Sequence, residues 1–577
     1  NQLLQQRDVV IYEAAFKYDN LFIRVDILEK KGNQINLIEV KAKSFKEGDK
    51  KKDVKFSSDW SLYLFDVAFQ KYVIEKAHPH FSVKPFLMLA DQAKTASVDG
   101  LNQMFRIRKN NGNRISIEKR EEQLAKLEFP KDSVLSLKDV SEIVTKIETG
   151  EHRILKDYKL EEAIKVLSKA YENDRYFGYP LDFAKCKHCE FNTDENSKHK
   201  KSGFKECFQK QLGWNEEDFK APNAFEIWDF RRWNNLNDTG KLKLTEIEND
   251  EFGDIKPGKS GLSRVERQLI QKYKSIEEDE NIYVDREGLN KEMASWNPPY
   301  NFIDFEASTV ALPFYKGQHP YEKVVFQFSH HIYHENGRIE HANEYINVEP
   351  GVFPNFEFVR ALKLALEQNE GSVFQFSPFE NSTLNQIKRQ LESSSEPDKD
   401  VLITFIKTLT TPPKSRDNNE ETWEAEREMI DLCDVIKTYY YNPHTKGSNS
   451  IKAILPAIFK TSTLIKEKYS RPLSEINMTS KNYLKDYKWL KIINGEIEDP
   501  YKSIDKPFED WDDDFERKSD IHEINDGGAA LTAYGLTQYT DMSAEERNSL
   551  RKALLKYCEL DTLAMVIVFE HLSEIIN

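Results

Sequence analysis

Four carboxylates stand inside short apolar runs of this 577-residue chain, and they constrain its fold more than any other feature. Asp26 lies in IRVDIL, Glu39 lies in LIEVK, and Asp304 and Glu306 lie in FIDFEAS. Each run has the β-branched and aromatic content of a strand. Burying a lone carboxylate among such side chains costs free energy unless a partner compensates its charge. The chain is therefore expected to bring these acids to partners, in at least two separate places.

The first part of the chain has the pattern of an α/β unit. Three strand-like runs precede a helical stretch and a further apolar strand, and these lie at residues 9–16, 20–29, 35–43, 60–76 and 85–89. A helical region that contains cysteines then continues to about Trp214. We expect a first domain over residues 1–214.

A second α/β unit is predicted near the middle of the chain. Residues 215–298 are polar and mostly helical, so we expect them to form a connector. The strand FIDFEAS then opens a domain over residues 299–577, and a hairpin turns at Asn336 and Gly337. The predicted fold class is α/β throughout.

The first group of candidate site residues is Asp26, Glu39 and Lys41. Glu39 and Lys41 are two apart on one strand, so their side chains point to the same face. Two carboxylates beside a lysine could hold Mg²⁺ or Mn²⁺ through oxygen ligands. Such a metal activates water, and the lysine would stabilise the charged transition state. The alternative is a surface hairpin with ordinary alternation.

The segments around these residues, IYEAAF, RVDIL, LIEVKAKS and DVAFQKY, resemble the RecB-like branch of the PD-(D/E)XK nucleases. The resemblance implies a restriction-endonuclease-like fold. It also implies that Asp26 and Glu39 are metal ligands, that Lys41 is the catalytic lysine and that Gln70 lies near the site. The family usually has a tyrosine four positions after this glutamine, whereas Tyr72 follows by only two.

Three cysteines form a second candidate cluster. Cys186 and Cys189 make a Cys-x2-Cys pair, and seventeen residues separate Cys189 from Cys207. This spacing lets both thiolates of the pair reach one metal. Three cysteines leave a tetrahedral site one ligand short, and His188 or His199 could complete a zinc site.

RecB-like nucleases with iron–sulfur clusters resemble this pattern, with three cysteines after the nuclease core and one before it. The resemblance implies a [4Fe–4S] cluster, whose fourth cysteine we expect upstream of Asn1. Zinc and free buried cysteines are the alternatives. Cys433 and Cys558 lie far away and are expected to be core residues.

The second group of acids spans the C-terminal half. Asp304 and Glu306 are two apart on one strand and face one side. Tyr557 and Asp561 are four apart in LLKYCELDTLAMVIVFEHL, so they share a helix face. In SPFENSTL, Glu380 follows an apolar strand at the start of a helix.

This order resembles the tyrosine type of the DnaQ-like 3′–5′ exonucleases, which have an RNase H-like fold. The resemblance implies two divalent ions held by Asp304, Glu306 and Asp561, with Glu380 at the position of a further acid and Tyr557 orienting the water. The family normally has aspartate where this chain has Glu380. The alternative is an RNase H-like fold that binds nucleic acid without cutting it.

The C-terminal half as a whole, with DFEAS, YEKVVFQFSHH, HTKGSNSIKAILPA, DGGAA and YCELDTLAM, resembles a bacterial family catalogued as a domain of unknown function. A RecB-like nuclease usually lies upstream of that domain. The resemblance covers nearly the whole chain.

The charge of the chain limits how it can bind nucleic acid. The formal net charge is −15, which argues against a passive basic coat. Two strips of the chain are nevertheless locally rich in Lys and Arg. One holds Lys41, Lys43, Lys46, Lys50, Lys51, Lys52 and Lys55, and the other holds Arg106, Arg108, Lys109, Arg114, Lys119 and Arg120. Either strip could also be a solvated loop.

The remaining composition favours a cytoplasmic protein. Five cysteines in a chain of this length are too few and too uneven for an extracellular disulfide framework. There is no apolar run of about 20 residues and no secretory signal.

These features together predict a metal-dependent nuclease with two centres, acting on nucleic acid that we expect to be DNA, in DNA repair or anti-phage defence. One alternative is a nucleic-acid-binding scaffold that serves a partner. Another is RNA processing, because both folds also occur with RNA substrates. The intact acids favour the nuclease, since a pure binder gains little from them.

Overall fold

The computed structural model describes residues 2–49, 51–110, 114–193, 200–256, 260–413, 421–509 and 521–577. The chain is mixed α/β, as expected, and divides into two compact units. Unit 1 comprises residues 1–106, 116–179 and 309–322, and unit 2 comprises the rest. This division differs from the predicted domain ranges, because residues 180–298 belong to unit 2.

Unit 1 is built on a five-stranded sheet with the order β1-β2-β3-β4-β7. Its strands are β1 (Asp8–Tyr18), β2 (Leu21–Lys31), β3 (Gln34–Phe45), β4 (Ser82–Asp91) and β7 (Leu135–Asp139). β1, β2 and β3 form an antiparallel meander, whereas β4 is parallel to β3 and antiparallel to β7. The parallel pair requires a crossover, which the following helix supplies.

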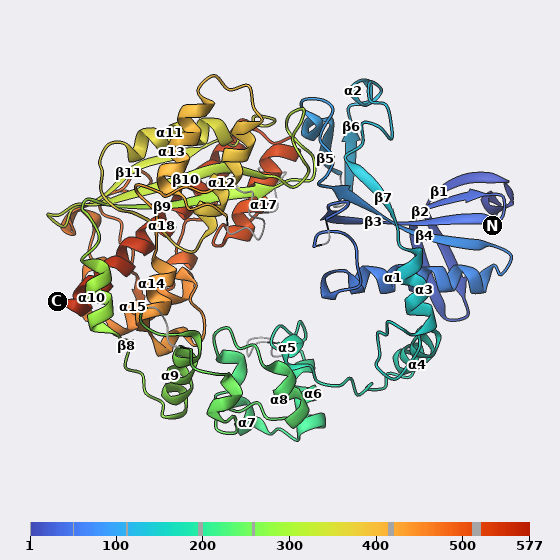
Figure 1. Cartoon of the computed structure of the whole chain (residues 1–577), viewed down its shortest axis with the longest axis horizontal. Helices are drawn as coiled ribbons and strands as arrows, with labels where there is room; N and C mark the ends of the chain where they lie inside the picture. Colours follow the sequence, from blue (N-terminus) through green and yellow to red (C-terminus); the bar gives the residue numbers. More distant parts are fainter. Residues whose placement is uncertain are drawn as a thin grey trace. The chain divides into compact units, whose positions relative to one another are not determined.

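Helix α1 (Ser58–Ala77) connects β3 to β4 and lies along the sheet (Figure 1). Its buried side chains, such as Leu64 and Val67, pack against inward-facing strand residues, such as Val25 and Leu37. The other helices of unit 1 are α2 (Glu121–Leu124), α3 (Ser141–Thr149) and α4 (Leu160–Glu172). β5 (Phe105–Asn110) pairs with β6 (Arg114–Lys119), and residues 107–115 of this pair are assigned to unit 2.

One segment of unit 1 comes from far along the chain. Residues 309–322 follow the strand that carries Asp304 and Glu306, and they hydrogen-bond to residues of the first hundred: the Ala96 N–H donates to the Gln318 carbonyl at 2.9 Å. The alternation of the neighbouring strands gives no sign of this insertion.

Unit 2 contains a six-stranded mixed sheet with the order β13-β12-β9-β10-β11-β15. Its strands are β9 (Tyr300–Thr309), β10 (Lys323–Tyr333), β11 (Ile339–Ile346), β12 (Val373–Gln375), β13 (Ile430–Asp431) and β15 (Met478–Thr479). β12 is parallel to both β9 and β13, whereas β10 and β11 are antiparallel.

Helices cover both faces of this sheet (Figure 1). One face packs on α11 (Asn355–Leu366), α12 (Phe379–Glu392) and α13 (Lys399–Leu409), and its core includes Ile303 and Phe305. On the other face lies the long helix α18 (Ala544–Ile576), where the ring centroids of Phe302 and Phe569 are 5.7 Å apart. Alternation along β9 therefore turns its even-numbered side chains toward α18.

The rest of unit 2 is largely helical. Residues 180–252 have an aromatic core around Phe208. The remaining α-helices of unit 2 are α5 (Phe183–Cys186), α6 (Gly203–Leu212), α7 (Glu216–Lys220), α8 (Trp233–Thr239), α9 (Arg264–Ile276), α10 (Arg286–Met293), α14 (Leu432–Tyr439), α15 (Ile451–Thr461), α16 (Thr463–Tyr469) and α17 (Gly527–Tyr539). Short strand pairs are β8 (Tyr283–Val284) with β14 (Tyr440–Tyr441), and β16 (Ile492–Ile493) with β17 (Glu496–Ile497). In the part of the chain that the structure describes, none of the helices has the length and apolar character needed to cross a membrane.

Candidate functional site

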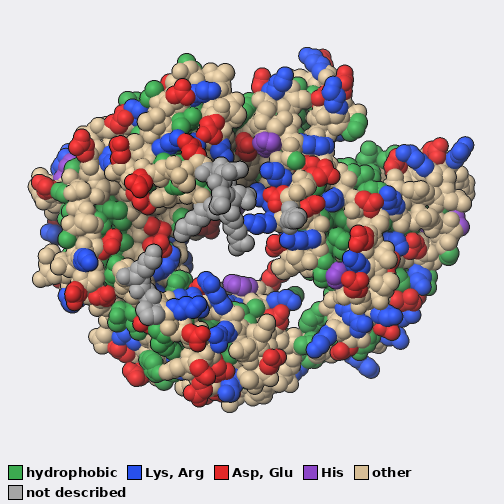
Figure 2. Space-filling view, in the orientation of Figure 1, with side chains coloured by type: hydrophobic (Ala, Val, Ile, Leu, Met, Phe, Trp, Pro, Cys, Tyr) green, Lys and Arg blue, Asp and Glu red, His purple; other side chains and the backbone are tan. Residues whose placement is uncertain are grey.

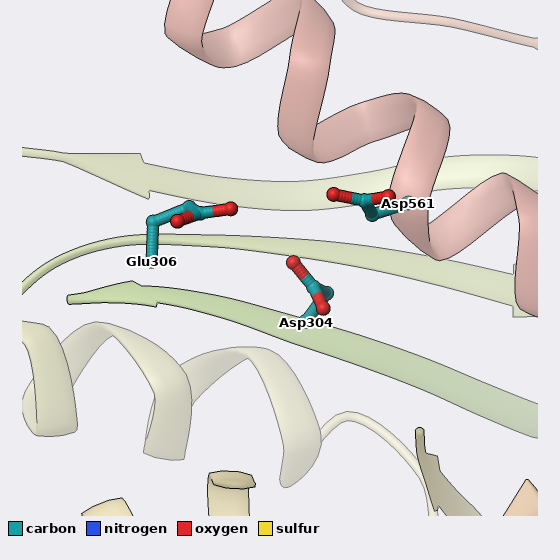
Figure 3. Close-up of side chains that lie close together, drawn as sticks. All are labelled: Asp304, Glu306 and Asp561. Carbon is teal, nitrogen blue, oxygen red and sulfur yellow. The ribbon is translucent and has the colours of Figure 1, made fainter. Parts of the chain in front are cut away.

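Three carboxylates meet between β9 and α18. Asp304 and Glu306 project from the same face of β9, and Asp561 projects from α18 (Figure 3). One oxygen from each of the three side chains lies within 4.8 Å of the others. Asp561 is more than 250 positions from Asp304 and Glu306 in the chain, so the packing of the last helix on the sheet brings the three together.

Buried hydrogen bonds fix α18 in this position. The Gln327 side chain on β10 donates to the Leu554 carbonyl at 2.8 Å. The Thr562 hydroxyl, next to Asp561, lies 2.7 Å from both the Ser329 hydroxyl and the His331 Nδ1. Hydrogen bonds between buried polar groups restrict how the helix can pack, so they help to set the position of the adjacent carboxylate.

Without a bound cation, ionisation of all three acids is unfavourable, because their negative charges are buried and lie close together. Burial, followed by the charge of Asp561, raises the pKa values of Asp304 and Glu306 well above the ordinary range. Burial also raises the pKa of Asp561. Grouped carboxylates of this kind must share protons or bind a cation. Their oxygen donors suit Mg²⁺ or Mn²⁺.

Glu380 lies beside this group rather than within it. It is in the first turn of α12 and is 2% exposed. Its Oε2 has no hydrogen-bond partner among the described residues, and its charge acts on both Asp304 and Glu306. An unsatisfied buried carboxylate oxygen is costly and is a natural ligand for a cation.

The raised pKa of Glu380 predicts how the stability of the metal-free protein depends on pH. Burial raises this pKa to about 8, from 4.5 for the ordinary side chain. Between these pH values the folded protein binds more protons than the unfolded chain, so the free energy of unfolding falls as pH rises. One such group contributes at most about 1.4 kcal/mol per pH unit.

We therefore expect the unfolding midpoint in EDTA to be lower at about pH 8.5 than at about pH 6. Glu380→Gln should reduce this pH dependence, because the amide does not titrate. Thermal unfolding of both proteins across this range measures the effect. Identical pH dependence in the two proteins would contradict the assignment of the raised pKa to Glu380.

Tyr557 points into the same site, together with two residues that sequence analysis missed. The Tyr557 side chain hydrogen-bonds to Asp561, and the Tyr501 hydroxyl donates to Asp561 at 2.6 Å. Lys452 donates to the Tyr557 hydroxyl at 2.9 Å. Tyr501 lies in an aperiodic segment that gives no signal, and Lys452 lies in HTKGSNSIKAILPA, where only the family resemblance draws attention to it.

The residues of the first group also lie together, in unit 1. Lys41 Nζ donates to Glu39 at 2.6 Å, and Gln70 Nε2 donates to the other oxygen of Glu39 at 2.9 Å. Asp26 accepts a hydrogen bond from the N–H of Val40, the residue after Glu39, at 2.8 Å. Asp26 on β2, Glu39 and Lys41 on β3, and Gln70 on α1 thus gather around the interior of these elements, where α1 lies against the sheet.

A fifth residue, Asp66, completes this group. It accepts hydrogen bonds from Lys41 at 3.0 Å and from Gln70 at 3.1 Å. It lies one helical turn before Gln70 in the DVAFQKY segment, so the i, i+4 spacing on α1 could have identified it. Within the described ranges, Asp26, Glu39 and Asp66 do not form a three-oxygen group like the one in unit 2.

In unit 1, the charge of Lys41 is held by the opposite charges of Glu39 and Asp66. Burial raises the pKa of Glu39, against the effect of its hydrogen bond to Lys41. Burial alone would lower the pKa of Lys41, but its hydrogen bonds to Glu39 and Asp66 outweigh this effect and raise it. Lys41 is therefore a cation held against two carboxylates. The Gln70 Oε1 atom is buried without a partner among the described residues.

The three cysteines lie in one region of unit 2. Cys186 ends α5, the Cys189 N–H donates to the Cys186 carbonyl at 3.1 Å, and Cys207 is on α6. Burial raises the pKa of the Cys186 thiol, and Cys189 and Cys207 act on it in the same direction. They do not form a three-ligand metal group among the described residues, and His199 lies outside those residues. Cys433 and Cys558 are buried, as expected.

The comparisons with known proteins bear on unit 2. Residues 301–450 match a family model described as a domain of unknown function, DUF2779. This range contains Asp304, Glu306 and Glu380, and it ends before Tyr557 and Asp561. Neither the comparison with curated proteins nor the comparison with solved structures found a match.

Proposed function

We propose that this chain is a metal-dependent nuclease that hydrolyses phosphodiester bonds in nucleic acid, with DNA as the expected substrate. The observation that carries the proposal is the meeting of Asp304, Glu306 and Asp561 in one oxygen-rich group. Carboxylates that converge in this way must share protons or bind a cation, and their oxygen atoms suit a divalent cation. The proposal includes two metal centres of different types, one in unit 1 and one in unit 2.

The centre in unit 2 is proposed to be DnaQ-like, on an RNase H-like fold. The proposal is supported by the packing of the last helix on the sheet, chiefly on β10, with Phe569 of this helix against Phe302 of the strand that carries the acid pair. The three carboxylates and the free oxygen of Glu380 fit divalent cations chemically. Bound cations of this kind lower the pKa of a coordinated water and polarise the phosphate.

The residues of the chain would perform the remaining steps in unit 2. Asp304, Glu306 and Asp561 would hold the cations, with Glu380 beside them. Tyr557 would orient the attacking water, because its hydroxyl is fixed next to Asp561. Orientation of this kind contributes to rate without any change in the chemistry.

The centre in unit 1 is proposed to be of the RecB-like PD-(D/E)XK type. Asp26 and Glu39 would supply metal ligands, and Gln70 would hold the Glu39 carboxylate through its hydrogen bond. Lys41 would stabilise charge that develops on the phosphate in the transition state. Asp66, which shares Lys41 with Glu39, would orient the lysine.

Binding of nucleic acid by this acidic chain must rely on local basic patches. On the face shown in Figure 2, acidic and basic side chains are interspersed. The second Lys and Arg strip falls on the β5 and β6 pair except for Arg120, which follows β6. Lys50 of the first strip lies outside the described residues. A charge-steered substrate would therefore bind more weakly as salt rises.

A second candidate function is a nucleic-acid-binding scaffold in which unit 2 does not cut. The position of Glu380 favours it, because this side chain lies outside the three-oxygen group and replaces the usual aspartate. Displacement of a catalytic carboxylate by about 1 Å can lower the rate roughly 10²-fold.

A [4Fe–4S] cluster on Cys186, Cys189 and Cys207 is a further part of the proposal, with zinc as the alternative. Anaerobically purified protein should contain iron and sulfide and should be brown. Cys186→Ala should remove the colour, whereas Cys433→Ala, a buried cysteine elsewhere in unit 2, should not. Colourless protein with stoichiometric zinc would support the alternative.

The nuclease proposal is tested with labelled single- and double-stranded DNA and RNA. Full-length protein is incubated with each substrate in Mg²⁺, Mn²⁺ or EDTA, and the products are separated by size. We expect cleavage in Mg²⁺ or Mn²⁺ and none in EDTA. Metal-dependent binding without any cleavage would favour the scaffold.

A further inference from the structure

A lysine lies beside the three carboxylates of unit 2. Lys452 is in the first turn of α15, and its Nζ donates to the Tyr557 hydroxyl at 2.9 Å and to the Asn525 carbonyl at 3.0 Å. The same nitrogen is 4.8 Å from the ring centroids of both Tyr501 and Tyr557. A cation held by two hydrogen bonds and two aromatic rings has a well-defined position.

Both tyrosines connect this lysine to Asp561. The Tyr501 hydroxyl donates to Asp561, and Tyr557 hydrogen-bonds the same carboxylate. Because Lys452 donates to the oxygen of Tyr557, the hydroxyl proton of Tyr557 must point elsewhere, and Asp561 can accept it. The charge of Lys452 also acts on Glu306 and Asp561.

The backbone that carries Lys452 is anchored at several points. The Gln271 side chain donates to the Lys446 carbonyl at 2.6 Å. Gly447 packs so closely on Glu226 that a Cβ atom would lie 2.0 Å from the Glu226 carbonyl oxygen. α15 itself packs on α18, the helix that carries Tyr557. The direction from which Lys452 approaches Tyr557 is therefore set by the fold.

We propose that Lys452 is a positioning residue of the centre in unit 2, which fixes the Tyr557 hydroxyl and weakens the binding of divalent cations to the three carboxylates. The inference rests on the proposed function. A fixed hydroxyl keeps the attacking water oriented, which favours turnover. A positive charge close to Glu306 and Asp561 repels an incoming cation. The same side chain should thus raise turnover and lower cation affinity.

These two effects are separable in the full-length protein. Glu39→Gln first disables the centre in unit 1, so that Mn²⁺ binding and cleavage report on unit 2. We expect Lys452→Met to bind Mn²⁺ about tenfold more tightly. We expect its kcat on single-stranded DNA to fall about 10- to 100-fold, with little change in KM. Lys452→Arg should restore most of both properties.

A matched control and a double-mutant cycle keep this test specific. Lys460→Met makes the same change at the exposed end of α15 and should alter neither property. In a Tyr557→Phe background, Lys452→Met should still tighten Mn²⁺ binding but should lower kcat by no more than about twofold further. Unchanged Mn²⁺ affinity in Lys452→Met, or losses in kcat that multiply in the double variant, would overturn the inference.

Failure of this inference is distinguishable from failure of the proposed function. Cleavage by the wild type combined with unchanged Mn²⁺ affinity in Lys452→Met overturns the role of Lys452 alone. Tighter Mn²⁺ binding by Lys452→Met without cleavage by any variant overturns the nuclease proposal and the part of the inference that concerns turnover, while it supports the effect of Lys452 on cation binding.

Discussion

Replacing Asp304 by asparagine should lower 3′-end degradation about 10³-fold or more, in a chain whose centre in unit 1 is already disabled by Lys41→Ala. A loss of this size corresponds to about 4 kcal/mol of transition-state stabilisation. Asparagine keeps the shape of the side chain but removes one of the three negative charges that would hold the cations. The rate is measured on 5′-labelled single-stranded DNA in Mn²⁺.

This prediction has two controls, which are the stability of the Asp304→Asn protein and the activity of a variant at a second aspartate. Burial and the charges of Asp561, Glu380 and Glu306 disfavour the ionised form of Asp304, so Asp304→Asn should leave the metal-free protein at least as stable as the wild type. Asp434→Asn, at an exposed position on α14, should retain activity. Degradation by Asp304→Asn at the wild-type rate would refute the assignment of this centre.

The strands that carry the acids could be predicted because two independent signals agree. The apolar runs predict strands at residues 20–29 and 35–43, and the structure has Leu21–Lys31 and Gln34–Phe45. The spacing of two between Asp304 and Glu306 predicts a shared face, and the structure has that arrangement. Local periodicity cannot say which distant helix will cover that face, and for Asp561 only the family resemblance supplied this link.

Other parts of the site could not be predicted, because their signals arise only from tertiary packing. A lysine or a tyrosine can lie at a protein surface without any energetic penalty. Nothing in the sequence therefore distinguishes Lys452 and Tyr501 from ordinary surface residues. Lys452 gains a role because α15 packs on α18, and Tyr501 gains one because its hydroxyl reaches Asp561 of α18. The insertion of residues 309–322 into unit 1 also could not be predicted, since a segment between two strands reads like any other connection.

Replacing Lys41 by alanine should lower cleavage by the centre in unit 1 about 10²- to 10³-fold, in a background where Asp304→Asn has disabled the other centre. This is the loss expected when one charged group that stabilises the transition state is removed. Two further consequences act in the same direction. Asp66 loses its cation, and Glu39 keeps only its hydrogen bond from Gln70, so this buried carboxylate is more readily protonated and holds a metal less well.

Lys43→Ala is the matched control, because it removes the same charge two residues along the same strand. Lys43 Nζ donates to the Asp59 carbonyl at 2.7 Å and lies over the Trp60 ring, whereas Lys41 Nζ donates to Glu39. If Lys43 serves only to attract the phosphate backbone, Lys43→Ala should raise KM in a salt-dependent way and leave kcat unchanged. Lys41→Ala should instead lower kcat at every salt concentration. Equal losses of kcat in the two variants would show that charge in this strip, rather than the position of Lys41 between Glu39 and Asp66, determines the rate.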